Sequence, residues 1–145
     1  METKGRHLIL EISGCDPEVL NDIEKVRNIL TEAANRANAE VRETAFHRFY
    51  PQGVSGVVVI SESHLSVHTW PEYGYAALDI YTCGEDTDPW KALKFAAEEF
   101  KAREVCLTSI SRGERENGRF VHKITRNLTG NLVEEIGEEA VDVVS

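Results

Sequence analysis

The sequence predicts an α+β fold, a two-layer sandwich in which a mainly antiparallel β-sheet carries two helices packed on one face. Two Asp-Pro pairs, at residues 16–17 and 88–89, each mark the start of a helix. Four short segments with alternating or β-branched apolar residues lie between these helix starts, joined by short turns. Consecutive strands with short connections favour antiparallel pairing, with the helices forming a second layer.

The N-terminal half contains a strand, a helix and a second strand. Residues 6–12 are short and apolar, as expected of a strand. From Asp16-Pro17 to Ala37 the apolar residues follow a helical period, which predicts one helix with one apolar face. Residues 41–49 alternate as a strand, and the Pro-Gln-Gly sequence at residues 51–53 is a turn that ends it.

The second half contains three more strands, a helix and a final strand. The strands are expected at residues 54–60, 65–70, 75–82 and 104–110. The helix begins at Asp88-Pro89 and continues to about Lys101. From residue 112 to residue 145 the chain is polar and then acidic, and we expect a mobile tail there, or else a marginal helix or strand.

A short internal similarity suggests a pseudo-twofold repeat. The segment LEISGC at residues 10–15 is matched by LDIYTC at residues 78–83, and each precedes an Asp-Pro helix start. Two strand–cysteine–helix units fit a sheet covered by two helices, although short apolar strands also resemble one another by coincidence. The length of 145 residues fits a single domain spanning residues 1–145.

Charge and composition exclude several classes of protein. The chain has 16 basic and 25 acidic residues, a net charge of −9, which argues against a nucleic-acid partner. It has neither a signal-peptide pattern nor an apolar run of about 18 residues, so we expect no membrane segment. Three widely spaced cysteines fit neither a disulfide framework nor a zinc site, and reduced thiols indicate a cytoplasmic location.

The segment SESHLSVHTWPE, residues 61–72, concentrates proton-carrying side chains on a predicted strand. Alternation places Leu65 and Val67 on the face towards the helices. The other face then carries the polar and aromatic residues of the segment, namely His64, Ser66, His68, Trp70 and Glu72. A half-polar strand with solvated histidines explains this pattern without any function, and that interpretation stays open.

Two further interpretations of these residues are disfavoured. His64 and His68 are about 13 Å apart on a strand, and no HExxH pattern accompanies them, so we expect no metal. The segment around Ser55 resembles the nucleophile elbow of a serine esterase, but that motif requires glycine where this chain has Val57.

The segment ISESHLSVHTWPEYGYAALDIYTCGEDTDPW closely resembles the processing and catalytic segment of prokaryotic S-adenosylmethionine decarboxylases, which use a pyruvoyl group. GRHLILEISGCD and FHRFYPQGVSGVVVISE resemble the same family, so the resemblance covers about residues 5–105. It implies decarboxylation of S-adenosylmethionine to the aminopropyl donor for spermidine biosynthesis. Some relatives decarboxylate arginine or ornithine, which the motif does not distinguish, and a non-catalytic paralogue is a further alternative.

The resemblance implies that the chain cleaves itself between Glu62 and Ser63. The Ser63 hydroxyl attacks the carbonyl carbon of Glu62, an ester forms, and β-elimination and hydrolysis leave a pyruvoyl group with loss of ammonia. Residues 1–62 become the β chain, and residues 63–145 become the α chain capped by the pyruvoyl group.

The resemblance also implies roles for individual residues in processing and catalysis. The pyruvoyl group from Ser63 forms a Schiff base with the substrate amine. His68 is the proton acceptor of the elimination step in processing, and Ser55 supports the processing centre by hydrogen bonding. Cys83 is the proton donor in catalysis.

Substrate binding and assembly are implied in the same way. Glu72 accepts hydrogen bonds from the ribose hydroxyls and Phe49 stacks on adenine, while Leu65 and Trp70 line the pocket. The family further implies a homodimer of cleaved protomers, with each active site drawing on both chains. No metal ion is implied.

Overall fold

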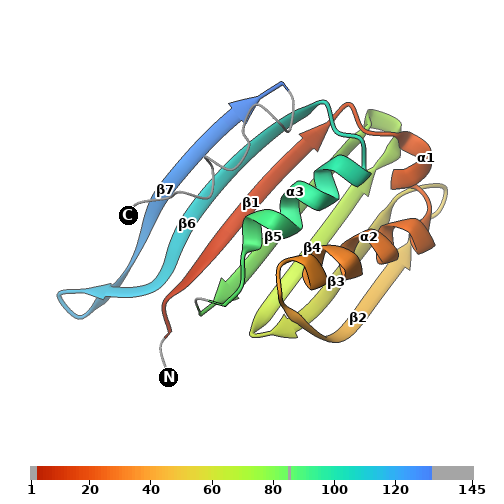
Figure 1. Cartoon of the computed structure of the whole chain (residues 1–145). Coiled ribbons are helices and arrows are strands. Elements are labelled where there is room, and N and C mark those ends of the chain that lie inside the picture. The colour runs from red at the N-terminus through yellow and green to blue at the C-terminus, as the bar shows by residue number, and fades with distance from the viewer. Residues whose placement is uncertain (1–2, 85, 132–145) are drawn as a thin grey trace.

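The computed structural model describes residues 3–84 and 86–131. In these residues a seven-stranded sheet has the order β2-β3-β4-β5-β1-β6-β7, and every neighbouring pair of strands is antiparallel. Figure 1 shows the helices together on one face of the sheet. The predicted two-layer α+β sandwich is confirmed. No helix in the described part of the chain has the length and hydropathy needed to span a membrane.

Strands β1 to β5 occupy the predicted regions with small differences at their ends, whereas β6 extends beyond its predicted end and β7 was not predicted. They are β1 (Gly5–Ser13), β2 (Glu40–Arg48), β3 (Val54–Ser61), β4 (Ser63–Trp70), β5 (Tyr75–Cys83), β6 (Glu104–Glu116) and β7 (Arg119–Gly130). The helices are α1 (Pro17–Leu20), α2 (Ile23–Arg36) and α3 (Pro89–Glu99), and a 3₁₀ helix, η1, spans Pro71–Tyr73.

The single helix predicted after Asp16 is wrong, because the chain forms two helices there. Helix α1 ends at Leu20, and Asp22 caps the start of α2. The Asp22 carboxylate accepts hydrogen bonds from the backbone N–H groups of Glu24 and Lys25, at 3.0 and 3.1 Å. Aspartate stabilises a helix start in this way, so it ends one helix and begins the next within an unbroken apolar pattern.

The core lies between the helices and the strand residues that face them. Leu10, Leu65 and Ile80 from three neighbouring strands are fully buried, as are Leu30 of α2 and Leu93 of α3. Burial of one such side chain contributes about 1.5–3 kcal/mol. The hydrophobic layer therefore fixes which face of each strand is turned away from the helices.

The expected mobile tail over residues 112–145 is wrong for its first part, where the chain forms strands instead, as in the alternative expectation: β6 continues to Glu116 and β7 pairs with it as far as Gly130. Asn117 and Gly118 connect them, with φ values of 51° and 80°. Asn-Gly with two positive φ values is the preferred two-residue hairpin connection, a signal that the sequence contains. Residues 132–145 lie outside the described residues.

The similar segments at residues 10–15 and 78–83 lie on adjacent antiparallel strands, β1 and β5. Leu10 is directly opposite Leu78, the register that a local twofold axis between these segments requires. One strand pair does not establish a repeat, so the pseudo-twofold organisation stays a prediction.

The contact between Gly56 and Phe46 yields a stability prediction. A Cβ atom on Gly56 would lie 2.0 Å from the ring atom Cδ2 of Phe46, and the ring itself packs against the core below Arg27 of α2. Gly56→Ala should lower the free energy of unfolding by about 1–3 kcal/mol, as overpacked cores do. Chemical denaturation measures this, and in a double-mutant cycle Gly56→Ala should cost less in the Phe46→Ala background. An equal cost in both backgrounds would contradict the assigned clash.

Candidate active site

The face of the sheet that no described helix covers, here called the open face, carries the polar side chains of the central strands. Leu65 and Val67 of β4 are fully buried towards the helices, as predicted, so the residues between them point to the other side. The open face includes His7, Ile9 and Glu11 of β1, Ser55 of β3, His64, Ser66, His68 and Trp70 of β4, and Tyr75, Ala77, Asp79, Tyr81 and Cys83 of β5.

Ser63, the predicted cleavage residue, is the first residue of β4 and has an unusual backbone conformation. Its φ is 134°, in the region that residues with a side chain rarely adopt. In a regular strand Ser63 and His64 would project to opposite faces. Instead, the Ser63 Oγ lies 3.3 Å from the Nδ1 atom of His64, so the two side chains meet.

Asp79 of β5 connects the imidazoles of two strands. Its Oδ2 atom lies 2.9 Å from His64 Nε2 and 2.5 Å from His7 Nε2, while the Ser66 hydroxyl donates to Oδ1. Burial alone raises the pKa of this carboxyl, but the hydrogen bonds from His7, Ser66 and His64 outweigh burial and hold the pKa well below its usual range. Asp79 is therefore ionised at neutral pH.

The sequence alone did not predict that His7, Asp79 and Arg112 belong to this hydrogen-bonded cluster. His7 stands in an apolar strand and receives an Arg112 hydrogen bond at its Nδ1 atom, at 3.0 Å. An aspartate within the apolar segment ALDIY was a detectable signal, because ionisable residues within strands seldom lack a partner or a function.

The structure pairs Ser55 with His68 but places both far from Ser63. Ser55 lies opposite His68 on β3 and β4, and its Oγ is 2.8 Å from His68 Nδ1. His68 and Ser63 are five residues apart on one strand, which corresponds to about 17 Å. Within one protomer, the predicted processing residues therefore form two separate groups.

Cys83 belongs to the group around Ser63. Its neighbour Thr82 pairs with Ser63 across β4 and β5, and Cys83 is partly exposed on the open face. Burial and a hydrogen bond with Cys83 raise the pKa of the Tyr81 hydroxyl. By contrast Cys15 is buried, and this raises the pKa of its thiol to about 12. Cys83 lies on the strand that pairs with Ser63, and its role as proton donor stays a prediction.

The residues expected to bind the substrate lie at the opposite end of β4, with one exception. Phe49 and Trp70 are 47% and 39% exposed, and the Trp70 ring stacks on Tyr75 at 5.2 Å. Glu72 is exposed in η1 rather than on the strand. Leu65 is fully buried in the core with its side chain directed away from the open face, and its part in substrate binding stays a prediction.

A shallow cavity of about 260 Å³ separates the two groups. Ser66 and His68 line it from β4, and Ala77 and Asp79 line it from β5. His7 and Ile9 of β1 and Leu78 of β5 also line it. The open face is thus hollowed between the Ser63 group and the His68 group.

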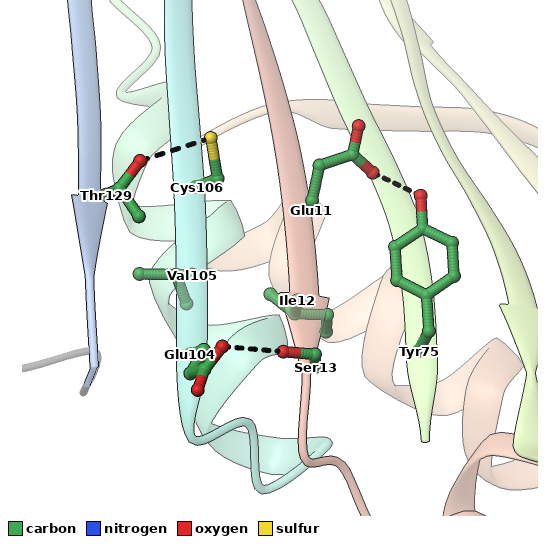
Figure 2. Close-up of a pocket in the computed structure, with 8 residues that line it drawn as sticks. All are labelled: Glu11, Ile12, Ser13, Tyr75, Glu104, Val105, Cys106 and Thr129. Atoms are coloured by element: carbon green, nitrogen blue, oxygen red, sulfur yellow. Dashed lines mark hydrogen bonds between the residues drawn. The ribbon is translucent and has the colours of Figure 1, made fainter. Parts of the chain in front are cut away.

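A second cavity of about 270 Å³ lies further along the sheet, at β1, β5, β6 and β7 (Figure 2). The Tyr75 hydroxyl donates a hydrogen bond to Glu11 at 2.5 Å, and Ser13 donates to Glu104 at 3.4 Å. Burial raises the pKa of Tyr75 to about 12, with smaller contributions from its hydrogen bond to Glu11 and from the negative charge of Glu11. None of the residues predicted for processing or binding lines this cavity.

Three groups on the open face have the spacing of metal ligands. One ligand atom each from His7, His64 and Asp79 lies within 4.8 Å of the others. In the described geometry His7 and His64 each hydrogen-bond the Asp79 carboxylate through Nε2. The expectation of no metal stays a prediction.

Comparisons with known proteins identify the family. The family model described as S-adenosylmethionine decarboxylase matches residues 6–113. The S-adenosylmethionine decarboxylase proenzyme of Moorella thermoacetica is 58% identical over 113 residues, which is 78% of this chain and 90% of the relative. The proenzyme of Pyrococcus horikoshii is 54% identical over 125 residues, 86% of this chain and 90% of the relative.

A solved structure gives the same result. The adenosylmethionine decarboxylase of Aquifex aeolicus superposes with a TM-score of 0.74 at 30% identity, covering 82% of this chain and 98% of that one. Fold and site define the class, an α+β sandwich with serine, histidine and cysteine side chains gathered on its open face. The chain belongs to the S-adenosylmethionine decarboxylase family, as the resemblance predicted.

The Tyr75–Glu11 hydrogen bond predicts a pH dependence of stability. Folded Tyr75 keeps its proton up to about pH 12, whereas an unfolded tyrosine loses it near pH 10. The stabilisation by Tyr75 is therefore complete below pH 10 and is lost as the pH rises to about 12. Between these pH values, urea unfolding should show a steeper loss of stability in the wild type than in Tyr75→Phe. Tyr50→Phe is the control, since Tyr50 is 94% exposed; equal slopes for Tyr75→Phe and wild type would contradict the assignment.

Proposed function

We propose that this chain is a proenzyme that cleaves itself between Glu62 and Ser63 and then decarboxylates S-adenosylmethionine, giving the aminopropyl donor for spermidine biosynthesis. The observation that carries the proposal is the geometry of Ser63, a serine with φ of 134° whose hydroxyl meets an imidazole. The relatives' description as proenzymes supports self-processing.

The conformation of Ser63 favours cleavage of the bond before it. A residue with a side chain in a sparsely populated backbone region costs on the order of 1–3 kcal/mol. Neighbouring strands hold this conformation, because β4 pairs with β3 through Ile60 and with β5 through Thr82. Cleavage between Glu62 and Ser63 releases the constraint, so the folded precursor is higher in energy at the bond that breaks.

The chain's own residues fit the pyruvoyl group that Ser63 would become. A pyruvoyl group supplies an electron-accepting carbonyl for loss of carbon dioxide from an amino acid. Cys83 lies beside Ser63 across the β4–β5 pair and would donate the proton that replaces the lost carboxylate. Tyr81, two residues before Cys83 on the same face of β5, would help to orient that thiol.

We expect the complete active site to form between two copies of the chain. Ser55 and His68 lie about 17 Å along the sheet from Ser63 of the same protomer, which is too far for them to act on it. Two protomers packed with their open faces together and their strands reversed would bring Ser63 of one near His68 of the partner. A sheet face that no described helix covers gives such a homodimer a reason to form.

The substrate would bind where Phe49, Trp70 and Glu72 are exposed. Phe49 offers a flat face for adenine, and the carboxylate of Glu72 offers acceptors for the ribose hydroxyls. Aromatic faces also attract a sulfonium cation, with about 0.5–2 kcal/mol per contact. The net charge of −9 adds a favourable field for a cationic ligand.

The alternatives to this function have no support in the comparisons. Arginine and ornithine decarboxylation is not supported, since the matched relatives and the family are named for S-adenosylmethionine. An inert paralogue is equally unsupported. A cytoplasmic location stays a prediction.

Intact mass spectrometry tests the proposed cleavage. Purified wild-type protein should convert from one species of 16.3 kDa to two fragments, one ending at Glu62 and the other beginning at the converted Ser63. It should release labelled carbon dioxide from carboxyl-labelled S-adenosylmethionine. Ser63→Ala should remain one species and release none. The control is Ser61→Ala. The wild-type Ser61 hydroxyl accepts a hydrogen bond from Arg42 and has no proposed part in cleavage, so this variant should still give two fragments. An uncleaved wild type, or a cleaved Ser63→Ala, would refute the proposal.

Co-expression tests the shared site. Expressed alone, His68→Ala should cleave at least about 100-fold more slowly than wild type, because its proton acceptor is missing. Co-expressed with Ser63→Ala, the His68→Ala chain should recover cleavage, since its Ser63 then meets His68 of the partner. Differently tagged chains on a denaturing gel show which one is cut. If the mixed sample cleaves no faster than His68→Ala alone, each protomer completes its own site and the shared arrangement is wrong.

A further inference from the structure

We infer that His64, held in place by Asp79, is the base that takes the proton from the Ser63 hydroxyl in the first step of self-cleavage. This assignment rests on the proposed self-processing and adds a residue that the family resemblance did not assign. It separates the first proton transfer, to His64, from the later elimination, for which His68 is proposed.

The first argument is the geometry of the serine and the imidazole. Ser63 Oγ lies 3.3 Å from His64 Nδ1, within hydrogen-bond reach of a general base. The unusual φ of Ser63 creates this contact, because a regular strand would send adjacent side chains to opposite faces. In the same protomer His68 is about 17 Å away along β4.

The second argument is the position of the ring protons. Arg112 only donates hydrogen bonds, so His7 Nδ1 accepts from it and the His7 proton is on Nε2, directed at Asp79. Asp79 is ionised and accepts, so His64 must also carry its proton on Nε2. The Nδ1 atom of neutral His64 therefore has a free lone pair facing Ser63 Oγ.

The third argument is that the neighbouring groups hold the ring in this state. His64 contacts Tyr81 with ring centroids 6.4 Å apart and His7 at 5.9 Å in an edge-on arrangement. The Arg112 guanidinium lies over the Tyr81 ring at 4.3 Å. On the β3 side, His64 pairs with the apolar Val59. Among the described residues, Asp79 is the anion that hydrogen-bonds the ring, and it stabilises the imidazolium formed when the proton arrives.

The step balances within the chain. The Ser63 O–H proton moves to His64 Nδ1 as Oγ forms a bond to the carbonyl carbon of Glu62. The bond between that carbon and the Ser63 nitrogen then breaks, and His64 returns the proton to the departing nitrogen. The products are an ester between Glu62 and Ser63 and a free amine, with no net proton gained or lost.

Hydroxylamine separates this step from the later one, because it cleaves esters rapidly and leaves amides intact. Full-length His68→Ala should accumulate ester, and hydroxylamine should split it into two fragments. His64→Ala should form ester about 10²–10⁴-fold more slowly than His68→Ala, the usual loss for a missing general base. Hydroxylamine should therefore leave His64→Ala intact. His122→Ala, an exposed histidine of β7, is the control and should process as wild type does.

Further readouts distinguish a base from a structural residue. Free imidazole should partly restore cleavage of His64→Ala, and His64→Gln should form ester as slowly as His64→Ala does. The second variant keeps a polar side chain of similar size and guards against misfolding. Asp79 is a positioning residue in this proposal. Asp79→Asn should therefore form ester more slowly than His68→Ala, which keeps Asp79 and accumulates ester.

Two results would overturn the assignment. Ester formation in folded His64→Ala or His64→Gln at the rate of His68→Ala would remove His64 from the first step while leaving self-cleavage intact. A wild type that never cleaves would remove the proposed function and this inference together.

Discussion

The one-sided covering of the sheet is the constraint on which the structure depends. Helices α2 and α3 bury one face of each central strand, so apolar residues such as Leu65 and Ile80 must point towards them. Strand alternation then sends every other residue to the open face. The residues proposed for processing and proton transfer share the open face because apolar residues of the core occupy the opposite face. They are Ser55, Ser63, His64, His68 and Cys83.

Asp79 organises the chemistry on this face. A carboxylate within an apolar strand is costly unless it is hydrogen-bonded, and His7, His64 and Ser66 supply its partners. The same bonds fix the orientation of two imidazoles. This partly buried charge thus stabilises the pairing of the central strands and also orients a proton acceptor towards Ser63.

The length of the sheet is the reason for proposing that two protomers share the reaction. The residues proposed for processing divide into a group at Ser63 and Cys83 and a group at Ser55 and His68, about 17 Å apart along β4. A flat sheet does not bring its ends together. Pairing of two open faces offers a short chain a two-sided cleft that a single two-layer sandwich lacks.

The sequence by itself determined the local structure and the family. Alternation and capping residues gave the strands and helix starts, and the motif around Ser63 gave the family. Two local predictions failed although the sequence contained the right signal. At Asp22, the continuous apolar pattern hid a helix-capping residue. At Asn117-Gly118, the polar composition hid a hairpin turn. Only the tertiary structure decided that His7, His64 and Asp79 meet, since they come from three strands far apart in the chain. Hydrogen bonds between such strands depend on sheet order and register, which no local pattern specifies.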